Sequence, residues 1–349
     1  MTEPVPEKPQ RRPRYRGKNP RRFHEKYKEL QPDRYAHDVE KVLAGGKTPA
    51  GTHRPIMVRE ILEVLAPKAG EVAVDCTLGY GGHARAILQA IQPGGKLIGL
   101  DADPIEAAKT EARLRSLGFP EESLVVRVRN FAGLAGVVAV DSPGGVDLAL
   151  ADLGISSMQI DDPSRGFSIK FDGPLDMRMN PKKGRSASEL LSTWDEAELT
   201  RILEEYADEP RALELSSAIL KAHARKPLLT TLALVDVIET LFARLPSRFA
   251  GLVDDTIRRV FQALRIAVND ELGSLATLLR VLPSCLKPGG RVAILTFHSG
   301  EDRQVKSAFK KGFGDGTYSR IGEDVIRASP QERHDNPRSF SAKLRYAVR

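Results

Sequence analysis

The sequence predicts an α/β fold: a doubly wound, mostly parallel sheet into which a helical domain is inserted. Short apolar segments alternate with helical patterns from residue 72 to residue 151, a rhythm typical of strands and helices that build a parallel sheet. A glycine turn at 79–82 separates the first strand from the first helix. After Asp152 the alternation stops, and about a hundred residues more than one crossover needs precede the next convincing strand.

The expected elements follow one another in a regular order. We expect strands at 72–76, 96–100, 124–128, 146–151 and 291–297, with a last strand near 342–348. We expect helices between the first four strands at 83–92, 104–117 and 131–140. The helix at Pro104 starts well because proline lacks the N–H that a first turn leaves unpaired. Beyond Asp152, helical patterns cover 195–206, 210–223, 231–244 and one long helix at 255–282, and a Pro-Gly-Gly turn follows at 288–290.

The chain therefore divides into three predicted parts. Residues 53–155 and 256–349 form the sheet domain, residues 156–255 form the inserted helical domain for substrate recognition, and residues 1–52 form a basic extension. Prolines and a shortage of aliphatic side chains argue against a packed fold in the extension, which we expect to be disordered.

The excess positive charge of the chain lies in its N-terminal part. Residues 1–54 hold fourteen Lys and Arg against seven Asp and Glu, which equals the whole net charge of +7. Basic segments that contain aromatic residues, here Tyr15, Phe23 and Tyr27, favour nucleic acid through phosphate contacts and stacking. We expect the extension to contact nucleic acid, and a solubilising tail is the alternative.

Composition excludes several other classes of protein. No apolar run approaches the length of a membrane span, so we expect no membrane partner. The two cysteines, Cys76 and Cys285, cannot form a disulfide framework or a zinc site. Their apolar surroundings predict inert core thiols, no metal site and a reducing cytoplasmic location. A homodimer is compatible with the sequence.

The glycine turn predicts a site for an adenosine-containing cofactor. It lets backbone N–H groups approach a ligand closely, and Asp101, at the tip of the next strand, can accept hydrogen bonds from a ribose diol. Gly79, Gly81 and Ala84 meet only the tolerant form of the dinucleotide fingerprint. Asp75, four residues before the first glycine, completes a pattern that resembles the first motif of S-adenosylmethionine-dependent methyltransferases.

Other candidate site residues follow the remaining strands. Ligands bind at the carboxyl ends of strands in open α/β sheets, so Phe131, Asp152 and His298 should lie near Asp75 and Asp101. Each also has a structural interpretation: Phe131 as a core residue, Asp152 as a helix N-cap, and His298 as a helix-entry residue before a capping pair of Ser299 and Asp302. Their collection at one edge favours the functional interpretation.

Two polar, glycine-containing segments, 152–162 and 165–179, come directly after the fourth strand. A structured loop beside a cofactor edge is a candidate wall of the substrate site. Its structural interpretation is a connector to the helical domain that is held by ion pairs of Asp176 and Arg178.

Several distinctive motifs occur between His53 and the C-terminus. They are Gly-Gly-His at 81–83, Asp-Leu-Gly-Ile-Ser-Ser at 152–157, Arg-Gly-Phe-Ser at 165–168, Asp-Gly-Pro-Leu-Asp-Met-Arg-Met at 172–179, Phe-Gln-Ala-Leu-Arg-Ile-Ala-Val-Asn-Asp-Glu-Leu at 261–272, Phe-His-Ser at 297–299, Glu-Asp-Arg at 301–303 and Ser-Ala-Lys-Leu-Arg at 341–345. In these motifs the chain resembles the bacterial small-subunit (16S) ribosomal RNA cytosine N4-methyltransferases of the MraW type. It departs from the family at Gly300, where leucine is usual, in its basic extension, and in the short stretch before Asn336-Pro337-Arg338.

The resemblance implies the fold of S-adenosylmethionine methyltransferases, S-adenosylmethionine as the cofactor, and a cytosine in the decoding region of the small-subunit RNA as the substrate. It implies cofactor contacts at Gly81, Gly82, His83, Asp101, Phe131, Asp152 and Gln159. It also implies a cytoplasmic enzyme whose partner is the small ribosomal subunit RNA.

Asp152 and His298 are the candidates for catalysis. A cytosine amine is a poor nucleophile because its lone pair is delocalised into the ring. It must be held in line with the methyl group and given acceptors for its N–H bonds. Asp152 begins a segment that occupies the place where amino-methyltransferases commonly have an Asp/Asn/Ser-Pro-Pro-aromatic loop. We expect Asp152 to touch the cofactor and border the amine of an unpaired or flipped-out base, and His298 to be a second candidate for proton removal.

Three other functions stay open on the sequence. The tolerant glycine fingerprint and Asp101 are compatible with a nicotinamide dehydrogenase, although no hydride-relay site accompanies them. A ribosome assembly factor could keep the cofactor site without catalysis. An amino-methyltransferase could also act on DNA or on another RNA.

Overall fold

The computed structural model describes residues 55–244, 246 and 251–349. They all lie in one compact unit, Arg54–Arg349. The predicted basic extension at 1–52 lies outside the described residues. In the part of the chain that is described, no helix is both long and apolar enough to cross a membrane.

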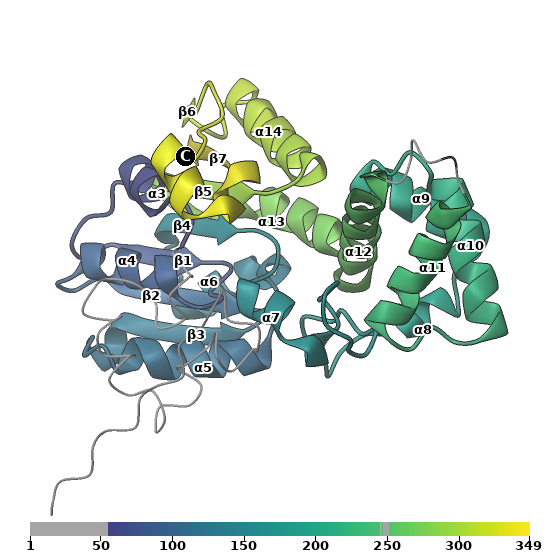
Figure 1. Ribbon diagram of the computed structural model, residues 1–349. Helices are drawn as coiled ribbons and strands as arrows, with labels where there is room; N and C mark the ends of the chain where they lie inside the picture. Colours follow the sequence, from purple (N-terminus) through teal and green to yellow (C-terminus); the bar gives the residue numbers. More distant parts are fainter. Residues whose placement is uncertain (1–54, 245, 247–250) are drawn as a thin grey trace, which may run out of the picture. The chain divides into compact units, whose positions relative to one another are not determined.

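Seven strands form one sheet in the order β3-β2-β1-β4-β5-β7-β6 (Figure 1). They are β1 (Val72–Asp75), β2 (Lys96–Asp101), β3 (Leu124–Val128), β4 (Val146–Asp152), β5 (Leu286–Thr296), β6 (Arg320–Ile321) and β7 (Lys343–Val348). The first five in this order pair in parallel, and β7 is antiparallel to its two neighbours. The strand order reverses at β1, so the prediction of a doubly wound, mostly parallel sheet is confirmed.

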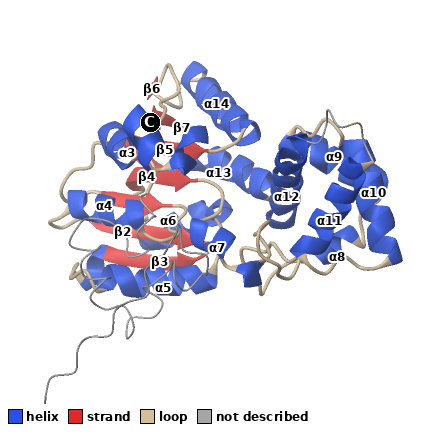
Figure 2. Cartoon of the chain, in the orientation of Figure 1, coloured by secondary structure: helices blue, strands red, loops and turns tan. Residues whose placement is uncertain are grey.

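Helices cover both faces of the sheet (Figure 2). They are α3 (Val58–Leu65), α4 (Gly82–Ile91), α5 (Pro104–Arg115), α6 (Leu134–Asp141), α13 (Glu271–Cys285) and α14 (Ser299–Gly314). Successive residues of β4 point to opposite faces, as the pleat requires. Ala149 and Ala151 belong to a hydrophobic cluster with α6, α13 and α14, whereas Leu148 and Leu150 belong to a cluster with α3, α4 and α5.

Between β4 and β5 the chain forms a helical segment with a hydrophobic core of its own. Its helices are α8 (Ala187–Leu191), α9 (Glu196–Ala207), α10 (Ala212–Arg225), α11 (Thr231–Ala243) and α12 (Val253–Asn269). Their buried apolar side chains form a third cluster that extends from Phe167 to Leu264. The predicted helical insertion is therefore present, and its boundaries at 156 and 255 stay a prediction.

The single long helix predicted at 255–282 is wrong, because the chain interrupts it at Asp270 to give α12 and α13. Asp270 adopts the left-handed conformation, with φ 46° and ψ 47°. A tertiary contact explains the break. The Asn269 side chain donates to the Met177 carbonyl at 2.8 Å and accepts the Met179 N–H at 2.7 Å. Apolar spacing continues through this point, so the sequence pattern could not reveal it.

Smaller differences concern short elements. The sequence did not predict α8, β6 or the short helices α7 (Ser157–Asp161) and α15 (Pro330–Asp335). The fifth strand begins at Leu286 rather than at 291, and its register against β4 shifts between Val146 and Leu148. The predicted turn at 288–290 is therefore a bulge inside the strand, where Gly289 has a φ of 75°.

Both cysteines lie in the cluster shared by α6, α13 and α14. Cys76 and Cys285 are free and buried. Burial raises the pKa of each thiol, which disfavours the reactive thiolate at neutral pH. The prediction of inert core thiols is confirmed.

Substitutions at Asp270 test the left-handed helix break. Aspartate already bears the steric cost of a Cβ atom in this conformation and makes no capping hydrogen bond, so Asp270→Ala should leave the free energy of unfolding nearly unchanged. Asp270→Gly should raise it by about 1 kcal/mol, because glycine adopts positive φ without this cost. Urea unfolding of both variants measures this, and equal stability of the alanine and glycine variants would contradict it.

Candidate functional site

Three aspartates meet where parallel strands end. Asp75, Asp101 and Asp152 are the last residues of β1, β2 and β4, and β1 pairs with β2 on one side and with β4 on the other. We call these three residues the carboxylate edge. Because β7 runs in the opposite direction, its first residue, Lys343, pairs with Thr296 at the same edge of the sheet.

The glycine turn joins β1 to α4 beside this edge. Gly79 and Gly81 have φ values of +47° and +79°, a region that side chains rarely adopt. A Cβ atom on Gly81 would come 2.7 Å from the Thr110 Cγ2 atom of α5. The Thr110 hydroxyl donates to the Gly79 carbonyl at 2.5 Å, and Arg113 donates to the Tyr80 carbonyl at 2.7 Å. Helix α5 therefore fixes the turn in a shape that brings backbone to the surface of the site.

Asp101 connects this turn to the end of β2. Its Oδ2 accepts the Gly79 N–H and its Oδ1 accepts the Asp103 N–H, both at 2.8 Å. Each oxygen keeps a further lone pair, which is what a ribose diol requires. Burial raises the pKa of Asp101 to about 7, although the two N–H groups oppose this shift. The carboxylate is therefore close to the midpoint of its titration at neutral pH.

Asp75, His83 and Asp152 form a buried polar cluster. Thr77 connects the Asp75 carboxylate to the backbone of Asp152: its N–H donates to Asp75 Oδ1 at 3.0 Å, and its hydroxyl accepts the Asp152 backbone N–H at 2.6 Å. His83 Nε2 lies 3.4 Å from Asp152 Oδ2. Asp75 Oδ2 and Asp152 Oδ1 are buried and have no hydrogen-bond partner among the described residues. Such orphaned acceptors are costly unless a ligand satisfies them.

The electrostatics of this cluster favour bound protons. Burial raises the pKa of Asp75 to about 6, against the opposing effect of His83. Burial by itself would lower the pKa of His83, but its contact with Asp152 and the charge of Asp75 together raise it. A histidine between two carboxylates, in a desolvated position, is suited to hold and pass on a proton near neutral pH.

Asp103, which the sequence did not single out, connects the edge to the following loop. Its Oδ1 accepts the Ile105 N–H at 2.9 Å, as a cap does. Its Oδ2 accepts from Gln159 Nε2 at 2.9 Å and from Arg165 Nη1 at 2.7 Å. Arg165 also donates to the Met179 carbonyl at 2.9 Å. Both side chains of this ion pair are buried, so the loop is fastened to the end of β2.

The same loop contains the expected ion pair of Asp176 and Arg178. Arg178 Nε and Nη2 donate to the two oxygens of Asp176 at 2.8 and 2.7 Å. The interpretation of residues 165–179 as a connector held by this pair is confirmed. An ordered loop can also form a wall of the substrate site, so the two interpretations of residues 165–179 are compatible.

The seven residues predicted to bind the cofactor lie on elements that end or begin at this edge of the sheet. Five surround the glycine turn and the carboxylate edge: Gly81, Gly82, His83, Asp101 and Asp152. Gln159 reaches it through Asp103. Phe131 begins a short 3-10 turn after β3 and packs partly against the cluster of α6 and α13. Their contacts with a cofactor stay a prediction.

His298 is the helix-entry residue expected from the sequence, but the capping box of α14 is formed by His298 and Glu301 and not by Ser299 and Asp302. Its Nδ1 accepts the Glu301 N–H at 3.4 Å, and its Nε2 lies 3.2 Å from Glu301 Oε1. Burial would raise the pKa of Glu301, but His298 and neighbouring donors hold it below its usual value. Gly300, the departure from the family, leaves room for this arrangement, since a Cβ there would come 3.2 Å from His298 Nδ1. A role for His298 in proton removal stays a prediction.

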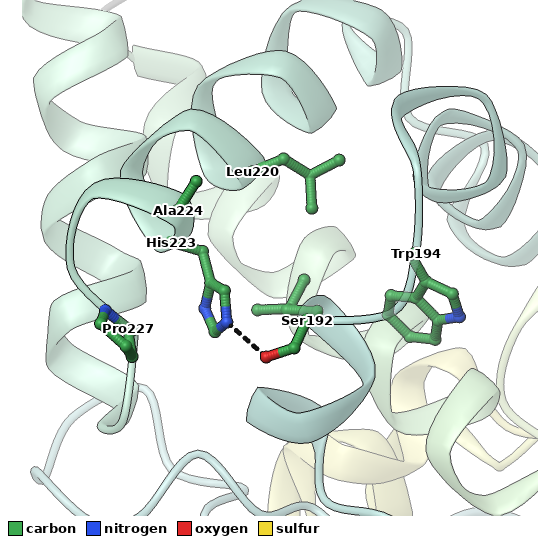
Figure 3. Close-up of a pocket in the computed structure, with 7 residues that line it drawn as sticks. Ser192, Trp194, Leu220, His223, Ala224 and Pro227 are labelled. Carbon is green, nitrogen blue, oxygen red and sulfur yellow. Dashed lines mark hydrogen bonds between the residues drawn. The ribbon is translucent and has the colours of Figure 1, made fainter.

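A shallow pocket of about 420 Å³ lies among α8, α10 and the segment that follows each of them (Figure 3). In it Ser192 Oγ lies 2.9 Å from His223 Nε2. His223 Nδ1 accepts the Leu228 N–H at 3.1 Å, so in the neutral ring the proton sits on Nε2 and points at the serine. Because His223 then donates to Ser192, it cannot take the serine proton, and the pair is not an activated nucleophile.

The geometry of the edge fits an adenosine-containing cofactor. The left-handed glycines expose backbone, Asp101 can accept from a diol, and the orphaned oxygens of Asp75 and Asp152 face no protein donor in the described chain. No group of histidine, cysteine and acidic side chains among the described residues could hold a metal ion. A doubly wound sheet with these features defines the class of enzymes that bind nucleoside cofactors at the carboxyl ends of their strands.

Within that class, the chain belongs to the MraW methylase family, whose sequence profile matches residues 50–349. This match confirms the family resemblance that the sequence motifs indicated. It also confirms the prediction that the cofactor is S-adenosylmethionine.

Similar proteins align over almost the whole chain. A ribosomal RNA small subunit methyltransferase H 1 from Lachnoclostridium phytofermentans is 50% identical over 341 residues, covering 97% of this chain and 93% of that protein. Its counterpart from Agathobacter rectalis is 48% identical and covers 97% of both. A methyltransferase H from a Geobacter species is 43% identical over 310 residues, covering 84% of this chain and 97% of its own. The first two alignments cover 97% of this chain and therefore include most of residues 1–52.

The raised pKa of Asp101 predicts how cofactor binding depends on pH. Its pKa of about 7 means that the carboxylate, the form that accepts both ribose hydrogen bonds, gains population as pH rises through 7. Affinity for S-adenosylmethionine should therefore be about ten-fold weaker at pH 6 than at pH 8. Calorimetric titration at the two pH values measures this. Asp101→Asn should bind weakly at both, and an unchanged pH dependence in that variant would contradict the assignment.

Proposed function

We propose that this protein transfers a methyl group from S-adenosylmethionine to N4 of a cytosine in the decoding region of small-subunit (16S) ribosomal RNA. The observation that carries the proposal is the orphaned, buried Oδ1 of Asp152 beside the glycine turn, in a chain of the MraW methylase family. The names of the relatives supply the RNA class.

The residues of the edge would hold the cofactor. Backbone groups of Gly81 and Gly82 approach it closely, Asp101 accepts from its ribose, and Phe131 offers an aromatic face for its adenine. When bound, S-adenosylmethionine supplies an electrophilic methyl group on a sulfonium, which needs no metal. The buried carboxylates, Asp75 among them, suit the positive charge of such a ligand.

Asp152 is the group that would contact the reacting amine. Its Oδ2 is directed toward His83 Nε2, 3.4 Å away, and its backbone N–H is held by Thr77 at 2.6 Å. This leaves Oδ1 as an acceptor for an amine N–H, which draws electron density onto the nitrogen and receives its proton once the new bond forms. His83 acts as a positioning residue that orients Asp152 and balances its charge.

The base would be presented from the loop at 165–179, the candidate substrate wall, which the Asp103–Arg165 pair fastens beside the edge. The inserted helical segment would contribute further RNA contacts, and the basic extension would bind phosphates. A cytoplasmic location accords with a ribosomal substrate. A homodimer stays a prediction, and analytical sedimentation of the purified protein tests it.

Substitution of Asp152 tests the chemistry. Asp152→Ala should abolish methyl transfer, and Asp152→Asn should lower kcat by about 100-fold or more, because an amide accepts a hydrogen bond and cannot take up a proton. Single-turnover methylation of small ribosomal subunits measures both. Asp147→Asn, at the opposite end of β4, is the matched control and should retain the wild-type rate. Wild-type activity in Asp152→Ala would reject the assignment.

The substrate class is tested by comparing acceptors. Labelled methyl transfer to purified small subunits, to naked small-subunit RNA and to DNA separates the proposed function from the other methyltransferase functions. Incorporation into the small-subunit RNA, located at N4 of one cytosine by mass spectrometry of nucleosides, is expected. Cofactor binding without transfer to any acceptor would instead indicate an assembly factor.

A further inference from the structure

The segment that enters β7 lies at the active edge of the sheet because β7 is antiparallel. Lys343, its first residue, pairs with Thr296, the last residue of β5. The residues before it, α15 and a 3-10 turn at Pro337–Ser341, must therefore lie beside the carboxyl ends of the parallel strands. This part is the yellow end of the ribbon in Figure 1.

Two contacts fasten this segment to its neighbours. Arg338 Nη2 lies 3.7 Å from Asp161 Oδ2, at the end of α7. Helix α7 in turn contains Gln159, which donates to Asp103 beside the edge. On the other side, Glu332 Oε1 accepts the Met57 N–H at 2.7 Å, and Glu332 is close enough to His83 to contribute to its raised pKa.

Phe340 projects from this fixed segment into solvent. Its side chain is 71% exposed, whereas its neighbours Ser339 and Ala342 are completely buried. The Ser339 hydroxyl donates to the Asn336 carbonyl at 2.8 Å, and the Ala342 N–H donates to the Ser339 carbonyl at 3.1 Å. The Phe340 ring is therefore carried by an ordered turn and is open to contact from outside the protein.

The surroundings of Phe340 indicate the chemistry of that partner. The Arg333 guanidinium lies 5.7 Å from the centre of the ring, and Arg338 is half-exposed on the same turn. An aromatic face with flanking arginines suits a nucleobase together with its phosphates, because the base stacks and the cations meet the backbone. A purely apolar protein partner would bring no charge that complements these arginines, of which Arg338 already faces Asp161 at 3.7 Å.

We propose that Phe340, with Arg333 and Arg338, is a stacking platform for an unpaired RNA base next to the target cytosine. This inference rests on the proposed function. It assigns to this chain a contact that positions the RNA through a neighbouring nucleotide, while Asp152 and the carboxylate edge act on the target base and the cofactor.

Substitutions of Phe340 test the platform. Phe340→Ala should raise KM for small ribosomal subunits about ten-fold, because stacking of one base contributes roughly this much affinity. It should leave single-turnover kcat and the affinity for S-adenosylmethionine unchanged. Phe340→Trp should restore KM, since indole also stacks. The matched control is Phe313→Ala, a 51% exposed phenylalanine near the far end of α14, which should behave as wild type.

The salt dependence separates stacking from charge. Phe340→Ala should leave the slope of log affinity against log salt unchanged, whereas Arg338→Gln should reduce it by about one. An unaltered KM in Phe340→Ala, an equal effect of Phe313→Ala, or weaker cofactor binding in Phe340→Ala would each overturn the proposal. So would a change in sedimentation with no change in RNA binding, which would assign the surface to a second copy of the chain.

Failure of the inference and failure of the proposed function give different results. If the unchanged protein methylates small subunits and Phe340→Ala does so with the same KM, only the platform is rejected. If the unchanged protein methylates neither small subunits nor their RNA, the proposed function fails and the platform with it.

Discussion

The buried carboxylate of Asp103 is the interaction on which the arrangement of the site depends. It accepts hydrogen bonds from the start of α5, from Gln159 and from Arg165. A buried ion pair gives little net stability, but loss of one partner leaves an uncompensated charge that costs about 3–5 kcal/mol. The cofactor edge and the loop that follows α7 are therefore constrained to keep one relative position.

The carboxylate edge is maintained at a cost to folding. The raised pKa values of Asp75, to about 6, and Asp101, to about 7, mean that the folded state holds protons which the unfolded chain has released above about pH 4. The contribution of these two groups to stability therefore decreases as pH rises from about 4 to about 7. A positively charged ligand that binds the ionised carboxylates offsets this loss. Such strain is typical of sites built for chemistry rather than for stability.

Local sequence was sufficient for those parts of the fold that depend on short-range pattern. The glycine turn, the acidic strand ends and the alternation of strands and helices follow from residue spacing, because side-chain period and turn chemistry are local properties. The break at Asp270 could not be foreseen, since it results from a contact between Asn269 and residues about ninety positions earlier.

The residues of the site also fall into those that the sequence could identify and those that it could not. Asp75, Asp101 and Asp152 could be identified because strand ends converge in a parallel sheet. The importance of Asp103 could not, since its partner Arg165 lies 62 positions further along the chain. Nor could sequence order show that the start of β7 lies at the active edge, because the antiparallel direction of that strand is a property of the assembled sheet.

The insertion between β4 and β5 also has a consequence for the route by which the chain folds. These strands are neighbours at the centre of the sheet, yet residues 153–285 separate them. Closing so long a loop costs conformational entropy before the pairing of the two strands stabilises the chain. The separate hydrophobic core of α8–α12 would reduce this cost if it formed first, because the span left to be closed would then be short.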